Sequence, residues 1–385
     1  MGKTAKLGDV CHIQSGNSIA AKKKTELFTN VVGTPYVATK DVGFDGSIDY
    51  ENGIYIPQEH VGSFKISPSG STLICAEGGS AGRKIAFSRN DCCFVNKLFS
   101  ITPSESLDAK YIFYYALSSE FQSQFKAALH GMIGGVSLNK IKDFTITIPP
   151  LAEQQRIVAK LDAAFAEIDK NIENLKNKIE QVESLVNRVL EEELKNAGRE
   201  NVKLGDICDI VSGQSPKSNY YNKEMKGTPF YQGAKDFGDR YLNEPTVWTT
   251  KISKKALPND ILISVRAPVG PLNITKQEIC IGRGLSAIRE REKVNWDFLF
   301  YSLEISIKNI ENKSGAVFDS INKKNLQSLL INLPPLEEQK QIVEKLDAIN
   351  LEKDISINAL NSQINNYISL KSSILSQELE GKITA

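Results

Sequence analysis

The chain has 385 residues, of which 41% are hydrophobic and 24% are charged. This composition is typical of a folded protein with two or three domains. No apolar run reaches the roughly 18 residues needed to cross a membrane, and the first residues lead into no apolar stretch. We therefore expect a cytoplasmic protein without a secretory signal and exclude a membrane-spanning one.

Charge is unevenly distributed, although the formal net charge is only +1. Residues 1–150 (15 basic, 13 acidic) and 198–335 (20 basic, 15 acidic) carry +2 and +5. Residues 151–197 (7 basic, 10 acidic) and 336–385 (5 basic, 8 acidic) each carry −3. The two basic segments favour a polyanionic partner.

The six cysteines include no C-x-x-C pair, and the three histidines lie far apart in the sequence. This spacing argues against a structural zinc site. We expect reduced, buried thiols instead.

The sequence contains a twofold internal repeat. Residues 149–163 recur at 334–348, where 11 of 15 positions are identical, and both copies read Pro-Pro-Leu-x-Glu-Gln. Residues 7–18 recur at 204–215 with eight of 12 identical. The repeat predicts two similar globules, each followed by a long helix. We assign 1–150 and 198–335 to the globules, and 151–197 and 336–385 to the helices.

Each globule is predicted to mix short strands with one helix, which gives an α+β fold class. Runs such as 71–75 and 260–265 are strand-like and bounded by turn residues. Amphipathic helices are expected near 108–130 and 295–312. A strand-like stretch at 145–148 or 329–333 leads into each long helix.

The acidic segments are predicted to form a coiled coil, because their apolar residues follow a 3.5-residue period. The first seam comprises Leu161, Phe165, Ile168, Ile172, Leu175, Ile179, Val182, Val186 and Val189. The second retains Leu346, Ile357, Leu360, Ile364, Tyr367 and Ile374 but has Asn350, Lys353 and Lys371 at apolar positions of the first. This imperfect seam favours pairing of the two helices within the chain.

No catalytic constellation is found in the sequence. Residues 78–84 resemble a phosphate-binding loop, but Ile85 stands where Ser or Thr is required. The Pro-Pro pairs lack the Asn and the aromatic residue of an adenine methyltransferase loop, so we interpret them as helix starts.

Polar residues in turns and loops are the candidates for contacts with a nucleic acid, because Arg, Asn and Gln read base edges and Lys holds phosphates. In the first globule they are Gln14, Asn17, Lys22, Lys23, Lys24, Lys40, Arg83, Lys84, Asn96 and Lys97. In the second they are Gln214, Lys217, Asn219, Tyr220, Tyr221, Gln232, Lys235, Arg240, Arg266 and Arg283. The segments 19–32 and 42–60 diverge from their counterparts 216–226 and 237–250. Similar scaffolds with different loops suit the recognition of two different short sequences.

The chain resembles the specificity (S) subunit of Type I restriction–modification systems, HsdS. The resemblance rests on the Leu-Gly-Asp and Ser-Gly opening, Gly-Thr-Pro, the segments 260–270 and 281–285, and both Pro-Pro-Leu-x-Glu-Gln helix starts. The first globule departs from the pattern at 75–79 and 94–98, where the Arg-x-Pro-x-Gly and Gly-Arg-Gly forms are missing.

The resemblance implies two target recognition domains, each contacting one half of a bipartite site in double-stranded DNA. It implies that the long helices pair antiparallel, hold the domains apart and dock two DNA adenine methyltransferase (M) subunits, with restriction (R) subunits as further partners. S-adenosylmethionine, ATP and Mg would belong to those partners, and this chain would catalyse nothing. A helix of about 40 residues is about 60 Å long, which suits half-sites spaced by about one DNA turn.

Two alternatives remain open at this point. A free-standing nucleic-acid enzyme requires a cofactor loop or acidic cluster that the sequence lacks. A non-catalytic coiled-coil assembly protein without DNA specificity explains the helices but leaves the paired globules with divergent loops unexplained.

Overall fold

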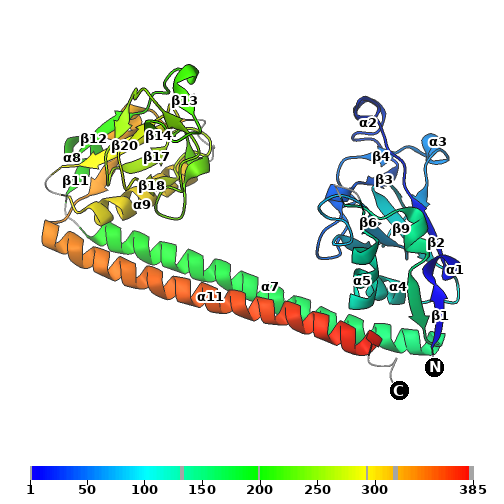
Figure 1. Ribbon diagram of the computed structural model, residues 1–385. Coiled ribbons are helices and arrows are strands. Elements are labelled where there is room, and N and C mark those ends of the chain that lie inside the picture. Colours follow the sequence, from blue (N-terminus) through cyan, green and yellow to red (C-terminus); the bar gives the residue numbers. More distant parts are fainter. Residues whose placement is uncertain (1, 131–133, 198–199, 292–293, 315–319, 381–385) are drawn as a thin grey trace. The chain divides into compact units, whose positions relative to one another are not determined.

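A computed structural model describes residues 2–130, 134–197, 200–291, 294–314 and 320–380. The chain divides into two compact units (Figure 1). Unit 1 comprises residues up to Leu175 together with those from Asn361 onward, and unit 2 comprises Lys176–Leu360. Each unit therefore contains one globule and a segment of each long helix.

The described residues of the globule of unit 1 form three small sheets and six short helices outside the long ones. Its strands are β1 (Lys3–Lys6), β2 (Cys11–Ser15), β3 (Thr34–Val37), β4 (Tyr55–Ile56), β5 (Ile66–Ser67), β6 (Thr72–Cys75), β7 (Ile85–Phe87), β8 (Cys92–Phe94), β9 (Leu98–Pro103) and β10 (Thr145–Ile148). Its helices are α1 (Leu7–Val10), α2 (Ala21–Leu27), α3 (Gln58–Val61), α4 (Ala109–Leu117), α5 (Ser119–Ala128) and α6 (Leu138–Lys142), with a 3-10 turn η1 (Thr39–Asp41). The sheet orders are β2-β9-β6-β7, β4-β3-β8-β5 and β1-β10.

The globule of unit 2 repeats this plan. Its strands are β11 (Asn201–Lys203), β12 (Cys208–Ser212), β13 (Tyr221–Asn222), β14 (Thr228–Tyr231), β15 (Trp248–Thr249), β16 (Lys255–Ala256), β17 (Ile261–Ser264), β18 (Leu272–Ile274), β19 (Ile279–Ile281), β20 (Leu285–Glu290) and β21 (Leu330–Asn332). Its helices are α8 (Leu204–Ile207), α9 (Trp296–Ser314) and α10 (Lys323–Gln327), with 3-10 turns η2 (Ser218–Tyr220) and η3 (Ala234–Asp236). The orders β12-β20-β17-β18, β13-β15-β14-β19-β16 and β11-β21 match unit 1 strand for strand, apart from β13. The predicted internal repeat and α+β class are confirmed.

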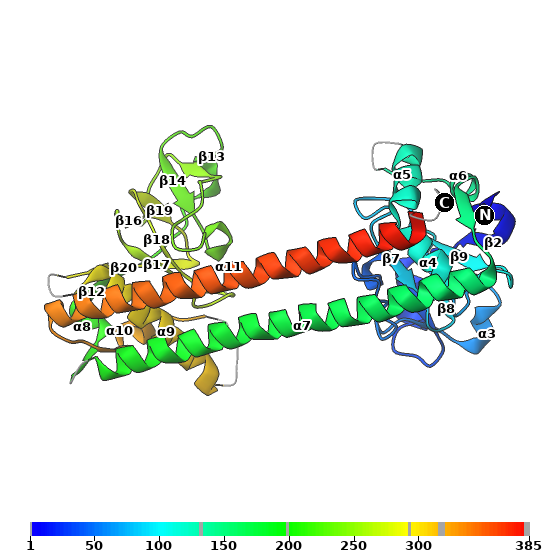
Figure 2. The same cartoon turned by 90° about the horizontal axis from the view of Figure 1, so that it is seen from below.

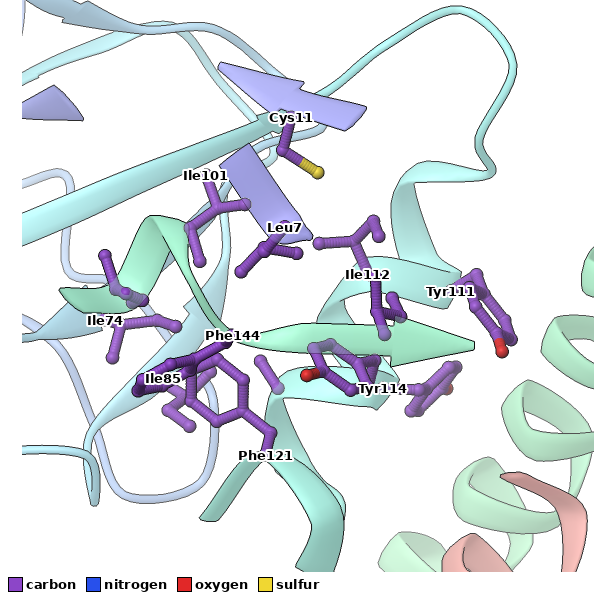
Figure 3. Packing of buried hydrophobic residues seen from close by; sticks show 14 of the residues in the cluster. Leu7, Cys11, Ile74, Ile85, Ile101, Tyr111, Ile112, Tyr114, Phe121 and Phe144 are labelled. Carbon is purple, nitrogen blue, oxygen red and sulfur yellow. The ribbon is translucent and has the colours of Figure 1, made fainter. Parts of the chain in front are cut away.

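The central strands β6 and β17 are buried along their whole length. Successive side chains of a strand point to opposite faces, and both faces of these strands are covered. Ile74 packs with helices α4 and α5 in the larger core, whereas Leu73 and Cys75 face the second sheet. Figure 3 shows Ile74 among the residues of this larger core, with Phe121 from α5 and Phe144 before β10. Fully burying one such side chain contributes about 1.5–3 kcal/mol.

The helix expected near 108–130 is two helices, so this prediction was wrong in part. Asp108 caps α4 by accepting hydrogen bonds from the backbone N–H groups of Lys110 and Tyr111. Ser118 then adopts an extended backbone, and its hydroxyl accepts a bond from the N–H of Phe121 to begin α5. The serine cap ends one helix and starts the next. Unit 2 has the single helix α9 in this place.

The long helices α7 (Leu151–Asn196) and α11 (Leu336–Glu380) run antiparallel to each other within each unit (Figure 2). In unit 1, Lys160 pairs with Glu378, and Lys371 donates to both oxygens of Asp169 at 2.7 Å. In unit 2, Lys345 pairs with Glu193 at 2.5 Å. Residue numbers rise along one helix as they fall along the other, so the predicted antiparallel coiled coil is confirmed.

The predicted seam residues of both helices are buried or half-buried. Beyond Val189 the buried positions change to Leu190 and Leu194 of α7 and Ala197 directly after it, and all three enter the main core of unit 2. The end of α11 does the same in unit 1, where Leu375 belongs to the main core. Each globule is thus completed by the start of one long helix and the end of the other.

The polar seam residues of α11 have specific partners. Lys371 lies 4.6 Å from the ring centroid of Phe165 in addition to its bonds to Asp169. Asn350 donates to the hydroxyl of Tyr301 at 3.3 Å, and Lys353 donates to Asn350 at 3.1 Å. These contacts fix the register of the pair, as single polar seam residues can.

The repeated Pro-Pro-Leu-x-Glu-Gln motif joins each long helix to its globule through a buried glutamine. Gln154 accepts a hydrogen bond from the backbone N–H of Asp108 at 2.9 Å and donates one to the Pro149 carbonyl at 2.9 Å. Gln339 accepts from the N–H of Asn295 at 2.6 Å and donates to the Pro334 carbonyl at 2.8 Å. The glutamine therefore links the start of the long helix to the start of α4 or α9.

A tyrosine and an aspartate form a second link at equivalent positions. The hydroxyl of Tyr114 donates to Asp162 at 2.6 Å, and that of Tyr301 donates to Asp347. These links and the glutamine links explain why the residues at 149–163 and 334–348 are repeated so closely.

None of the helices in the described ranges combines the length and the apolar character that crossing a membrane requires.

Candidate nucleic-acid interface

Each unit brings polar residues together at one end of its sheet β2-β9-β6-β7 or β12-β20-β17-β18. In unit 1, the segments after β2, β3 and β6 meet the turn between β8 and β9. In unit 2, the segments after β12, β14 and β17 meet the turn between β19 and β20. We define site 1 as Asn17, Ser18, Glu77, Asn96 and Lys97, and site 2 as Gln214, Ser215, Gln232, Arg266 and Arg283. Three of the five residues of site 1 and four of the five of site 2 were predicted from the sequence.

Backbone hydrogen bonds show that the two sites are equivalent. Asn17 donates to the Phe94 carbonyl at 2.8 Å, as Gln214 does to that of Ile281 at 2.9 Å. Isolated bridges pair Glu77 with Gly135 and Arg266 with Ser320. Glu77 and Arg266 therefore occupy the same place in the two frameworks.

A glycine holds the first loop of each site close to the β8–β9 turn or its counterpart. A Cβ atom at Gly16 would lie 1.9 Å from the Phe94 carbonyl oxygen, and one at Gly213 would lie 2.1 Å from that of Gly282. Such contacts are sterically impossible. The Ser-Gly repeat is thus explained by the close approach that places Asn17 and Gln214.

Site 2 surrounds a pocket of about 250 Å³. Its lining residues are Ser215, Gln232, Gly233, Ala234, Ser264, Arg266, Ala267, Arg283 and Gly284. The side chains of Arg266 and Arg283 are exposed, and the backbone N–H of Arg283 lies 3.4 Å from the Ser215 hydroxyl. Within the part of the chain that the structure describes, neither guanidinium has an ion-pair partner. Site 2 is therefore a cationic recess.

Site 1 has its polar groups bonded to one another. Ser18 donates to the Oδ1 of Asn96 at 2.6 Å, and Lys97 forms an ion pair with Glu77 at 2.9 Å. The Oδ1 of Asn17 accepts from the backbone N–H of Lys65 at 2.8 Å. Each asparagine side chain also carries two N–H donors, which suit hydrogen-bond acceptors on a ligand.

Phe44, which was not predicted from the sequence, lies in the turn between Val42 and Ile48. Its side chain is 63% exposed, and Arg83 and Lys84 lie 5.3 and 5.2 Å from its ring centroid. An exposed aromatic flanked by cations is suited to stacking on a base. Its position between the turn glycines Gly43 and Gly46 in a divergent loop was the available signal.

The remaining residues proposed for the first globule lie elsewhere on unit 1. Lys23 and Lys24 on α2 lie over the rings of Phe28 and Tyr36, at 5.8 and 5.2 Å. Lys22 lies 3.9 Å from Glu26, and Lys40 lies 3.7 Å from Asp41. Gln14 donates to the Ile66 carbonyl at 2.7 Å, which ties two strands together.

Several residues proposed for the second globule do not line the pocket of site 2. Lys217, Asn219 and Lys235 are exposed, and Lys251 lies 5.4 Å from the ring centroid of Tyr220. The ring of Tyr221 lies 4.8 Å from that of Phe230.

Arg240 lies against α9. Its guanidinium contacts Asp297 and lies 5.8, 5.1 and 5.8 Å from the rings of Trp296, Phe300 and Tyr301. This aromatic surround gives Arg240 a packing role that loop position alone did not indicate.

All six cysteines are buried and free of disulfide bonds. Burial raises the pKa of Cys11 and of its counterpart Cys208 to about 12. Such thiols stay protonated near neutral pH and are poor nucleophiles and metal ligands. In the described ranges, no three His, Cys, Asp or Glu side chains come together as a metal site.

Comparison with known proteins relates the whole chain to one family. The sequence model described as "Type I restriction modification DNA specificity domain" matches residues 3–181 and again 196–366. Over 273 residues the chain is 38% identical to a protein named as the type I restriction enzyme MjaX specificity subunit of Methanocaldococcus jannaschii. That alignment covers 66% of this chain and 64% of the relative, which is less than two thirds of the relative's length.

Two solved structures are similar over nearly the full length. One is a chain from a study of complex assembly and conformational transition of the type I R-M system, with 30% identity, a TM-score of 0.76, and 99% and 98% of the two chains covered. The other is the HsdS subunit of Thermoanaerobacter tengcongensis, with 30% identity, a TM-score of 0.51 and coverage of 98% and 96%. The resemblance noted from the sequence is confirmed.

Proposed function

Because the chain belongs to the family of Type I restriction–modification DNA specificity domains, we propose that it gives such a complex its DNA sequence specificity. Each unit reads one half of a bipartite site in double-stranded DNA. One observation carries this proposal: two equivalent frameworks hold different polar groups at the same place, with Arg266 where unit 1 has Glu77. An assembly scaffold without DNA specificity has no need of that difference.

Adenine-methylation mapping in cells that co-express the chain with its methyltransferase tests this proposal. We expect a split methylated motif that disappears when the chain is omitted. Methylation that does not depend on the chain would favour the coiled-coil assembly protein instead.

We also propose that two methyltransferase subunits dock on the long helices. Equivalent positions of α7 and α11 are 185 residues apart, as Leu151 and Leu336 show. These two leucines are 42% and 43% exposed, and the equivalent pair Leu185 and Leu370 is 53% and 46% exposed. Equivalent exposed apolar positions suit two copies of one partner.

The mass of the purified complex tests the stoichiometry, and two copies of the methyltransferase are expected. Leu185→Glu with Leu370→Glu is expected to weaken docking, whereas the exposed control Ser362→Glu leaves it intact. A complex with one methyltransferase contradicts the proposal.

The chemistry is assigned to the partners. We propose that S-adenosylmethionine is bound by the methyltransferase, that ATP and Mg serve restriction subunits, and that this chain is itself non-catalytic. The purified chain without partners is expected to bind no S-adenosylmethionine in calorimetry; saturable binding contradicts the assignment.

We propose that the length of α7 and α11 sets the number of unspecified base pairs between the half-sites. One heptad inserted into both helices adds about 10 Å of helix, or roughly three base pairs. The methylated motif should then gain spacer while both half-sites stay the same. An unchanged spacer contradicts this part of the proposal.

A further inference from the structure

We propose that site 2 binds the major-groove edge of a guanine through Arg266 and Arg283. The proposal deepens the function proposed above and rests on it. It states that the half-site read by unit 2 contains a G·C pair, and that the equivalent contact is missing from the half-site read by unit 1.

The pocket of site 2 presents donors to a planar ligand. Arg266 and Arg283 lie in its lining with Gln232, and both guanidinium groups are exposed. The major-groove edge of guanine offers two acceptors, O6 and N7, and a bidentate arginine is the commonest side chain that binds them. Neither guanidinium is engaged by an acid in the described part of the chain, so no ion pair has to be broken on binding.

The backbone holds both arginines in fixed places. Arg266 directly follows Val265, whose N–H donates to the Gly284 carbonyl at 2.9 Å and whose carbonyl accepts from Ile321 at 3.1 Å. Arg283 lies in the turn between β19 and β20, and its N–H faces the Ser215 hydroxyl. Base reading needs side chains on rigid supports, whereas a phosphate contact tolerates exposed residues such as Lys217 and Lys235.

Site 1 shows why the contact is specific to unit 2. Glu77 occupies the place of Arg266, and Asn96 that of Arg283. A carboxylate accepts hydrogen bonds but donates none, so it would be repelled by the two acceptors O6 and N7 of a guanine. Lys97 is engaged by Glu77 at 2.9 Å. Site 1 therefore lacks an arginine fork directed at guanine.

The test uses the purified complex of the full chain with its methyltransferase and DNA duplexes carrying the mapped motif. Each guanine of the half-site read by unit 2 is replaced in turn by 7-deazaguanine, which lacks N7, or by inosine, which keeps N7 and O6. At one position, 7-deazaguanine should weaken binding roughly 5-fold or more, and inosine should have little effect. Equal binding of all the duplexes overturns the inference.

Arg266→Lys and Arg283→Lys retain the positive charge but lose the paired N–H donors of the guanidinium. We expect each to weaken binding of the natural duplex and to lose the 7-deazaguanine effect at that position. A uniform loss with the effect retained identifies phosphate contacts and overturns the guanine assignment. Asn96→Ala is the matched control in site 1 and should change only the other half-site. If the variants fail to fold, the modified duplexes still test the wild-type complex.

The inference and the function on which it rests can fail separately. A split motif without guanine in the half-site read by unit 2 overturns the inference and leaves the function in place. The absence of any chain-dependent motif overturns the function itself.

Discussion

The two units share a framework but differ in one pair of hydrogen-bonded residues, which lies directly before β6 in unit 1 and directly before β17 in unit 2. In unit 2, Asp260 precedes β17 and accepts two hydrogen bonds from Arg289 at 2.8 and 2.7 Å. In unit 1, the equivalent residues Ser71 and Thr102 form a single hydrogen bond of 2.8 Å between their hydroxyl groups. A half-buried ion pair and a neutral pair thus occupy the same place, because either gives the buried polar group a partner.

This difference shows that the shared framework constrains the backbone positions of residues more strongly than their chemical type. The glycines, the linking glutamines and the tyrosine–aspartate links are the same in both units, since backbone approach or helix docking requires them. Positions that need only a matched pair are free to change. Site 1 and site 2 follow the same rule and carry different polar groups on equivalent backbone positions.

The largest expected difference between the units concerns alkaline pH. Burial raises the pKa of Cys11 and Cys92 to about 12 and that of Cys93 to about 11, from an ordinary 9. Burial likewise raises the pKa of Tyr111 and Tyr115. All of these groups lie in unit 1. The fold favours their neutral forms, so this stability is complete below about pH 9 and is lost as pH rises through about 12.

Unit 2 has fewer such groups among its described residues, namely Cys208, Tyr231 and Tyr301, each with a pKa raised by burial to about 12. Unit 1 should therefore unfold at lower pH than unit 2. Both tryptophans, Trp248 and Trp296, lie in unit 2, so their fluorescence follows that unit while circular dichroism follows both. A fluorescence transition at or below the pH of the first dichroism transition contradicts the prediction.

Asp260→Ala is expected to destabilise unit 2 by about 2 kcal/mol, because it leaves the half-buried Arg289 guanidinium and the backbone N–H of Leu257 without their partner. Asp260 is 2% exposed. Ser71→Ala in unit 1 should cost only about 1 kcal/mol. Urea unfolding followed by tryptophan fluorescence measures the first, and circular dichroism the second. The exposed Asp239→Ala is the control, and equal costs at both positions would remove the distinction between the units.

Gln154→Ala and Gln339→Ala should each cost about 1–3 kcal/mol, because each leaves a backbone N–H and a carbonyl unpaired. The neighbouring exposed glutamines provide matched controls: Gln155→Ala and Gln341→Ala should have almost no effect. Here the units are expected to behave alike. A large cost in one unit alone would show that the two links are not equivalent.

Lys371→Leu should change stability least, by about 0.5 kcal/mol in either direction, because its partner Asp169 is 60% exposed. The apolar residue restores the seam while the ion pair is lost. Thermal unfolding at low and high salt should show less salt dependence in the variant than in the wild type. Unchanged salt dependence would assign the register to other contacts.

The parts of the fold that could be predicted were those whose sequence is repeated in both halves of the chain. The helix starts at 150–151 and 335–336, the seam from Leu161 and the mixed globules follow from repetition and periodicity. The break at Ser118 was missed because Ser is compatible with both a helix interior and a cap, and only its backbone conformation decides.

The candidate sites could be predicted only in part, for a physical reason. Arg266, Arg283 and Asn96 lie in turns between strands, and such turns can be recognised from the sequence. Arg240 also lies in a loop, but packing against Trp296 and Phe300 engages it, and no local pattern reveals a partner more than 50 residues away. Phe44 was missed because aromatic residues are usually buried.

Unit 1 is built from two separate parts of the chain, and this has a consequence for folding during synthesis. Its core takes Leu375 from the end of α11, together with Leu161 from α7. Unit 2 is continuous, from Lys176 to Leu360. At roughly 5–20 residues per second, a ribosome needs about 10–40 seconds to pass from Leu175 to Asn361. The unit that is translated first is therefore completed last, and its core stays unfinished until the ribosome has passed Leu375.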